Sequence, residues 1–209
     1  MHIIEVTCTG NNGRSAMAEA IGNHTTKKLN LEDVLSFISS GTRAGPEYEK
    51  ILPYSEVVSI LSRASSHGLM KPAEVDRERY KQDSDYRVAI QDSVHMAFRI
   101  MRPIEAAFRD SALYNIGMRY DGTRTQTVAR DDVSVVLGME QKHVDQIKKI
   151  YSASEHRPII STITQYARYH GEIPDSIGST DPTVYFTIRD KLLELMPKVV
   201  TRFREEHQF

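Results

Sequence analysis

The feature that most constrains the fold is the start of the chain, where an apolar segment runs directly into a glycine-containing turn. His2–Thr7 is rich in Ile and Val, which favours a β-strand. Gly10–Gly13 interrupts this segment, and good helix formers follow from Ala16 to Ile21. Ser15 is the expected N-cap of that helix. The sequence therefore predicts a strand, a tight loop and a helix in immediate succession.

Short apolar segments and helical patterns continue to alternate along the chain. The alternation predicts an α/β fold with a central, largely parallel sheet and helices on both faces. Between about 46 and 113, two apolar-periodic pieces flank a strongly charged middle, and this part is expected to be mostly helical. The remaining strands are expected at 35–38, 132–138 and 158–163, and the remaining helices at 140–151 and 183–203.

Composition excludes several classes of protein. The 209 residues carry 27 Lys plus Arg and 28 Asp plus Glu, so no global charge attracts the chain to nucleic acid or anionic lipid. No apolar stretch approaches the roughly 18 residues of a membrane-spanning helix, and none resembles a signal peptide. The single cysteine cannot form an intramolecular disulfide, which favours a reducing compartment, the cytoplasm. The oligomeric state is not readable from the sequence.

The loop between the first strand and the first helix carries the chemistry. It reads Cys8-Thr9-Gly10-Asn11-Asn12-Gly13-Arg14-Ser15. A loop of this length can turn successive N–H groups inward, and the positive end of the following helix adds to this cradle for a tetrahedral dianion. The two glycines are expected to ease the turns. Arg14 would bind two phosphate oxygens with its planar fork, and Cys8 would lie beneath the phosphorus as the nucleophile.

A cysteine six positions before an arginine is by itself a weak signal, because free cysteines are usually buried structural thiols. The Gly-Asn spacing, the serine after the arginine and the strand-to-helix context make it specific. The thiolate is the reactive form of cysteine, and Ser15 could donate a hydrogen bond to the sulfur. The residues predicted to bind the substrate phosphate are Thr9, Gly10, Asn11, Asn12, Gly13, Ser15 and Ser40.

This loop resembles that of the low-molecular-weight protein tyrosine phosphatase family, which reads Cys-x-Gly-Asn-x-x-Arg-Ser after an N-terminal strand. The segment 39–42, Ser-Ser-Gly-Thr, is similar to the family's Ser-x-Gly-Thr turn, so Ser40 or Ser39 would share a hydrogen-bond network with Asn11. The segment 117–124 is similar to the family's Gly-Ile-x-x-x-x-His-Arg, although Thr123 replaces the histidine. The segment 135–140 resembles the family's apolar strand that ends in Met-Asp.

The resemblance covers residues 1–45 and 115–205, in the family's own order. It implies a single phosphatase-like domain over 1–209, with roughly fifty additional residues within about 50–112 that form a mostly helical insertion. Insertions between a strand and a helix often lie near the carboxyl ends of a parallel sheet. The insertion is therefore either a surface hairpin or a wall over the site.

The family places a general acid in an Ile-x-Asp-Pro turn before the last helix, and two aspartates compete for this role. Asp175 lies in Ile-Pro-Asp-Ser-Ile-Gly and has the better distance to the last helix, which favours it. Asp181 alone keeps the following proline. An Asp-Pro pair before a helix is also an ordinary N-cap followed by proline at the first helical position.

The resemblance implies a phosphatase that hydrolyses a phosphomonoester of a protein or small molecule through a cysteinyl phosphate, without metal or cofactor. The eight histidines show no paired metal-ligand spacing. Two alternatives stay open: an arsenate reductase that depends on an external thiol, because Cys8 is the sole cysteine, and a non-catalytic module that binds a phosphorylated partner. Asn12 replaces the residue that separates phosphoarginine-directed from phosphotyrosine-directed members, so the substrate class does not follow.

Overall fold

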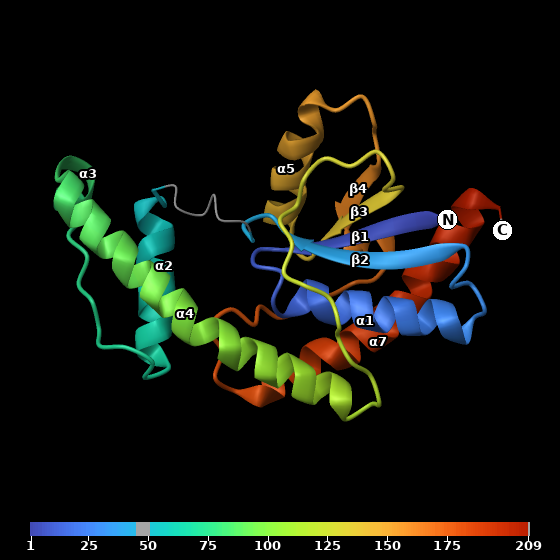
Figure 1. Cartoon of the computed structure of the whole chain (residues 1–209), viewed down its shortest axis with the longest axis horizontal. Coiled ribbons are helices and arrows are strands. Elements are labelled where there is room, and N and C mark those ends of the chain that lie inside the picture. The colour runs from blue at the N-terminus through green and yellow to red at the C-terminus, as the bar shows by residue number, and fades with distance from the viewer. Residues whose placement is uncertain (45–50, 209) are drawn as a thin grey trace.

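The computed structural model describes residues 1–44 and 51–208. Its centre is an all-parallel sheet of four strands in the order β2-β1-β3-β4 (Figure 1). The predicted α/β class is therefore confirmed. The strands are β1 (His2–Cys8), β2 (Leu35–Gly41), β3 (Val135–Gly138) and β4 (Ile159–Thr162).

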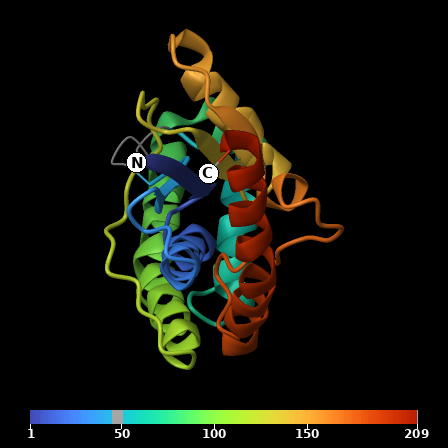
Figure 2. The ribbon, with the colours of Figure 1, turned by 90° about the vertical axis from the view of Figure 1, so that its right-hand side faces the viewer.

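Helices cover both faces of this sheet, as Figures 1 and 2 show. α1 (Arg14–Lys28) and α7 (Pro182–His207) pack together on one face, and α5 (Gln141–Ile150) covers the other. Side chains of a strand alternate between faces. Ile4 and Val6 accordingly join the main core under α1 and α7, while Ile3 packs into a smaller cluster around Ile147 of α5.

A group of three helices, here called the helical lobe (54–114), projects from the end of the sheet where the β1 loop lies (Figure 1). It consists of α2 (Tyr54–Ser66), α3 (Arg77–Gln82) and α4 (Ser84–Tyr114). The lobe has its own buried cluster, which includes Val57, Leu61 and Val94. α4 also reaches the main core through Ala112 and Leu113. Residue 50, at the start of the predicted insertion, lies outside the described residues.

The other secondary-structure elements are short. A 3-10 turn (Tyr151–Ala153) follows α5, and α6 (Ile163–Tyr166) follows β4. The predicted strand at 132–138 is shorter than expected, because it begins at Val135. The segment from Ala167 to Asp181 has no helix or strand and leads into α7.

The expected N-cap of α1 was wrong. Ser15 is not the N-cap, because α1 begins at Arg14 with Gly13 as its cap and no side-chain cap bond. The glycines of the loop do not provide its left-handed turn, which falls on Asn11 with a φ of 49°. Asparagine tolerates this region better than most residues. Gly13 instead allows close approach, because a Cβ there would lie 2.7 Å from the Ser176 hydroxyl.

Candidate active site

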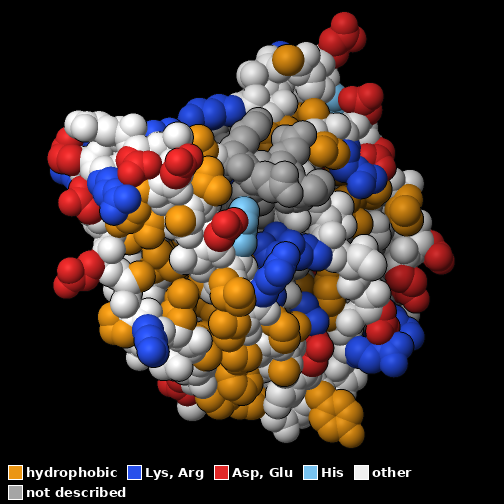
Figure 3. Space-filling model, turned by 60° about the vertical axis from the view of Figure 1, so that its left-hand side comes forward, with side chains coloured by type: hydrophobic (Ala, Val, Ile, Leu, Met, Phe, Trp, Pro, Cys, Tyr) orange, Lys and Arg blue, Asp and Glu red, His pale blue; other side chains and the backbone are white. Residues whose placement is uncertain are grey.

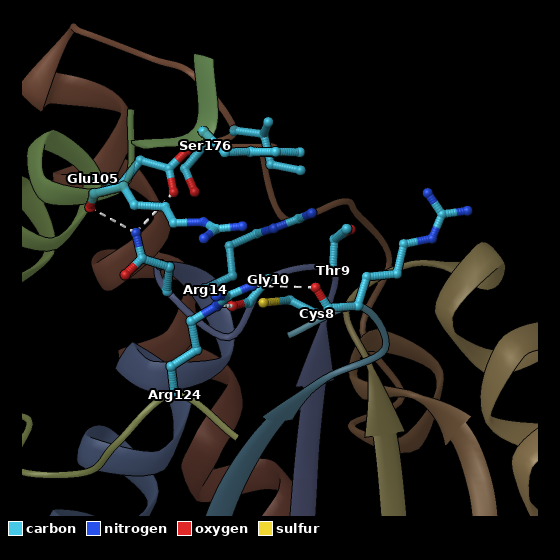
Figure 4. A pocket seen from close by; sticks show the side chains of 13 residues that line it. Cys8, Thr9, Gly10, Arg14, Glu105, Arg124 and Ser176 are labelled. Carbon is cyan, nitrogen blue, oxygen red and sulfur yellow. Dashed lines mark hydrogen bonds between the residues drawn. The ribbon is translucent and has the colours of Figure 1, made fainter. Parts of the chain in front are cut away.

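The β1–α1 loop forms the floor of a pocket with about 530 Å³ of empty space, part of which is open to solvent (Figure 4). The loop lies at the carboxyl end of the sheet, where parallel α/β folds bind their ligands. α4 of the lobe provides one wall, and the segment before α7 provides another. The lining residues are Cys8, Thr9, Gly10, Asn12, Gly13, Arg14, Arg43, Phe98, Arg102, Glu105, Arg124, Ser176 and Ile177.

Cys8 lies at the end of β1 with its side chain at the pocket floor. Its Sγ is 3.0 Å from the hydroxyl of Ser15, which also lies 3.0 Å from Asn11 Oδ1. Asn11 Nδ2 donates in turn to the carbonyl of Ser39 at 3.3 Å. The side chains of Asn11 and Ser15 thus lie behind the loop and hold its shape, and the Ser15 hydroxyl lies within hydrogen-bond distance of the sulfur.

Arg14 joins the loop to two carboxylates. Its side chain is only 2% exposed, and Nη2 lies 2.6 Å from Glu140 Oε1 and 2.9 Å from Asp175 Oδ1. Nη1 is buried and makes no hydrogen bond. A buried guanidinium with an unused donor is costly unless a further acceptor binds there. Arg14 therefore has a donor to spare for an anion above the loop.

Asp175 is held by both parts of the molecule. Its Oδ2 lies 3.2 Å from Nη1 of Arg63, on α2 of the lobe, and its Oδ1 accepts from the N–H of Ile177 at 3.3 Å. Burial alone would raise the pKa of Asp175, but Arg14, the Ile177 N–H and Arg63 lower it below its ordinary value. In this state the carboxyl group is ionised at neutral pH.

His143 supports the loop from α5. The N–H of Glu140 donates to its Nδ1 at 3.1 Å, so the proton of the neutral ring lies on Nε2 and donates to Thr9 Oγ1 at 2.9 Å. Burial, with a further contribution from Arg14, lowers the pKa of His143 to about 4. The ring is therefore neutral at physiological pH and acts as a hydrogen-bond donor to the loop.

The lobe contacts the loop at Asn12. Its Nδ2 donates to the carbonyl of Arg102 and to Glu105 Oε2, both at 2.9 Å, and its carbonyl accepts from Arg109 Nη1 at 2.8 Å. Glu105, 8% exposed, also accepts from the N–H of Gly178 at 2.8 Å. Burial raises the pKa of Glu105, and the hydrogen bonds from Asn12 and Gly178 oppose that shift. One carboxylate thus connects the loop to the segment that carries Asp175.

The predicted site residues Asp181 and Ser40, and also Thr123, which stands where the family has a histidine, do not line the pocket. Asp181 is exposed and caps α7, with its carboxylate accepting from the N–H of Thr183 at 2.9 Å. The Ser40 hydroxyl bonds to Thr7 and Thr127, and only its carbonyl lies near Ser15. At Thr123 the backbone carbonyl, 3.4 Å from Asn11 Nδ2, makes the contact to the loop.

Sequence reasoning assigned no role to several groups around the site, namely Arg63, Arg102, Glu105, Arg109, Glu140 and His143. Glu140 and His143 follow the carboxyl end of β3. Because all strands are parallel, the carboxyl ends of β1 and β3 lie at the same edge of the sheet. The sequence therefore contained a signal that these two residues lie near Cys8. The four lobe residues had none, because their positions depend on how the lobe packs on the sheet.

The class of protein follows from a cysteine at a strand end, a buried arginine with a free donor on the same loop, and a carboxylate paired with that arginine: a cysteine-dependent phosphatase. The chain belongs to the low molecular weight phosphotyrosine protein phosphatase family, whose sequence profile matches residues 3–111. The matched range includes the loop and most of the lobe. No curated protein sequence matches the chain.

Solved structures share the fold at low identity. The YwlE arginine phosphatase from Geobacillus stearothermophilus is 19% identical with a TM-score of 0.60, over 100% of this chain and 96% of that chain. A low molecular weight protein tyrosine phosphatase from Bacillus subtilis is 16% identical with a TM-score of 0.61, covering 98% and 99%. The Drosophila arginine phosphatase is 16% identical with a TM-score of 0.61, covering 98% of both.

Two structural features are absent from residues 1–44 and 51–208. Within these ranges no three His, Cys, Asp or Glu side chains cluster as a metal site would require. No helix in the same ranges is long and apolar enough to cross a bilayer.

Proposed function

We propose that this phosphatase hydrolyses a phosphate monoester in two steps at Cys8. The loop N–H groups and Arg14 bind the phosphate dianion. The Cys8 thiolate attacks phosphorus, the S–P bond forms as the P–O bond to the leaving group breaks, and Asp175 gives its proton to the departing oxygen. Water then attacks the cysteinyl phosphate, its proton passes to Asp175, and phosphate and thiolate are released. No metal or organic cofactor takes part.

The observation that carries this proposal is the position of Arg14 between the cysteine loop and Asp175, 2.9 Å from the carboxylate. In the free enzyme this ion pair keeps Asp175 ionised, whereas the first step requires its protonated form. A bound dianion competes for Arg14 and adds negative charge near Asp175. Both effects raise the pKa of Asp175, so that substrate binding itself favours the acid form.

The choice of Asp175 over Asp181 rests on the same geometry. Asp175 is partly buried and adjoins Arg14. Asp181 is used as the N-cap of α7 and faces solvent. Its pKa is lowered by the side-chain and backbone hydrogen bonds from Thr183. A carboxylate that caps a helix, faces solvent and makes no contact with Arg14 is poorly placed to protonate a leaving group above Cys8.

The test is turnover of para-nitrophenyl phosphate by the wild type and by Cys8→Ser. We expect the variant to lose at least about 10³-fold in kcat, while calorimetry still detects orthophosphate binding. Binding without turnover in the wild type would instead identify a non-catalytic phosphate-binding module. Consumption of arsenate in the presence of added glutathione, without phosphatase turnover, would identify a thiol-dependent arsenate reductase.

The substrate is a phosphorylated protein or small molecule, and nucleic acid is not an expected partner, since the formal net charge is -1. Asn12 occupies the loop position that separates phosphoarginine-directed from phosphotyrosine-directed members. Its side chain is hydrogen-bonded to α4, so this position does not indicate which of the two substrates is bound. We place the enzyme in the cytoplasm, because a nucleophilic cysteine needs a reducing compartment to stay reduced.

A further inference from the structure

Basic side chains surround the pocket, and most of them have an acidic partner. Figure 3 shows Lys and Arg side chains gathered near the centre of this face, next to hydrophobic ones. Two arginines in the pocket lining differ from the others: Arg102 and Arg124 form no ion pair within the described ranges. The paired groups are Arg14 with Glu140 and Asp175, Arg43 with Glu56, Arg63 with Asp175, and Lys142 with Glu140.

Arg102 is held in place by the lobe. It is partly buried on α4, and its guanidinium lies over the ring of Phe98, 5.0 Å from the centroid. The carbonyl of Arg102 accepts from Asn12 Nδ2 at 2.9 Å, so the backbone at this position is tied to the phosphate loop. A cation that is fixed beside the loop and forms no ion pair with a carboxylate is poised for an anionic ligand.

Arg124 approaches the same pocket from the other side of the loop (Figure 4). Its Nε donates to the carbonyl of Gly10 at 2.7 Å and its Nη2 to the carbonyl of Arg43 at 3.3 Å. These carbonyl groups orient the guanidinium of Arg124, but they are neutral and do not cancel its positive charge. Burial lowers the pKa of Arg102 and the nearby charge of Arg124 lowers it further, while the charge of Glu105 opposes these shifts in part. The two guanidiniums thus repel each other in the free enzyme.

A single phosphate does not require these two charges. The loop N–H groups, the helix end and Arg14 already match a dianion, which leaves Arg102 and Arg124 as an additional pair of cations in the same pocket. From this we infer that Arg102 and Arg124 bind a second phosphate or carboxylate group of the substrate, next to the phosphate that is transferred. The preferred substrates are then phosphate esters that carry a second anion close to the ester. This inference rests on the proposed function.

The test compares three non-hydrolysable ligands by calorimetry and by inhibition of para-nitrophenyl phosphate turnover. Methylphosphonate carries one anionic group, phosphonoacetate adds a carboxylate, and methylenediphosphonate adds a second phosphonate. We expect the wild type to bind at least one of the two double anions about tenfold more tightly than methylphosphonate, as a charged hydrogen bond contributes. The double anion that is preferred identifies the second group.

Arg102→Gln should reduce this preference to about twofold or less, and Arg102→Lys, which keeps the charge, should retain part of it. Arg99→Gln is the matched control, because Arg99 lies on α4 three residues earlier and is exposed outside the pocket. It should bind all three ligands as the wild type does. Thermal unfolding of each variant checks that the fold is intact.

Three results would overturn the inference: equal binding of all three ligands by the wild type, an unchanged preference in Arg102→Gln, or an equal loss for all three ligands in that variant. The last result would assign Arg102 to the site of the transferred phosphate. Calorimetry needs no turnover, so a failure of the proposed hydrolysis appears separately, as lack of para-nitrophenyl phosphate cleavage by a wild type that still binds the ligands.

Discussion

The sheet region and the helical lobe are built differently, although both line the same pocket. The sheet carries the main core, and it places Cys8 and Arg14 on one short loop at a strand end. The lobe has a separate apolar cluster and reaches the loop through polar side chains of α4. The proposed nucleophile and phosphate-binding arginine thus come from one segment that is local in sequence, while the lobe supplies charges and hydrogen bonds around them.

Asp175 lies where the two regions meet, so its replacement should have the largest effect. Asp175→Asn cannot donate the proton, and we expect kcat for an alkyl phosphate, a poor leaving group, to fall by about 10²- to 10³-fold. The loss should be smaller for para-nitrophenyl phosphate, whose leaving group needs less protonation.

Asp181→Asn is the matched control, since asparagine is also a good N-cap. Its kcat for both substrates should stay within about twofold of the wild type. A larger loss in Asp181→Asn than in Asp175→Asn would exchange the two roles, and the acid would then come from the N-cap of α7.

Whether the two cores unfold together can be tested by replacing one leucine in each. Leu192 is buried in the main core and Leu61 in the lobe. Each Leu→Ala change should lower the free energy of unfolding by about 3 kcal/mol. Because α4 runs through both clusters, we expect one unfolding transition in urea for both variants. If Leu61→Ala instead produced two transitions, or faster hydrogen exchange confined to α2 and α3, the lobe would open on its own.

Glu105 is one of the links between the regions. Glu105→Ala leaves the N–H of Gly178 without its acceptor and removes one of the two bonds to Asn12 Nδ2, which should cost about 2 kcal/mol. Because the β1–α1 loop and the segment before α7 are then less firmly held, kcat should fall by about tenfold. A double-mutant cycle with Asn12→Ala should give a coupling energy of about 1 kcal/mol. Additive losses would show that Glu105 stabilises α4 without positioning the loop.

The difference between the regions also explains what could be predicted. Cys8 and Arg14 were found because a strand, a loop and a helix that follow one another bring their residues together by local rules. The proposed choice of Asp175 over Asp181 depends on packing, because only the structure shows Asp175 beside Arg14 and Asp181 in a helix cap. Arg63 and Glu105 approach the loop across long sequence separations. No motif records such contacts, since they depend on how amphipathic helices pack.

The smallest expected effect concerns Glu5, which lies within the sheet at 1% exposure, with Oε2 unpaired. Burial raises its pKa, and hydrogen bonding to Ser40 and the charge of Arg130 oppose this only in part. The unfolded carboxyl group therefore ionises at lower pH than the folded one. As pH rises through that interval the wild type loses stability, and the loss persists above it.

Glu5→Gln mimics the protonated acid and removes this penalty. Urea unfolding at pH 7 should show the variant to be more stable by about 1 kcal/mol, and the difference should vanish below the ordinary pKa of glutamate, about 4. Turnover should be unchanged, because Glu5 lies outside the pocket lining. A wild type more stable than Glu5→Gln at pH 7 would mean that the ionised carboxylate is satisfied in the fold. The fold would then stabilise an ionised carboxylate within the sheet as well as it does at the boundary with the lobe.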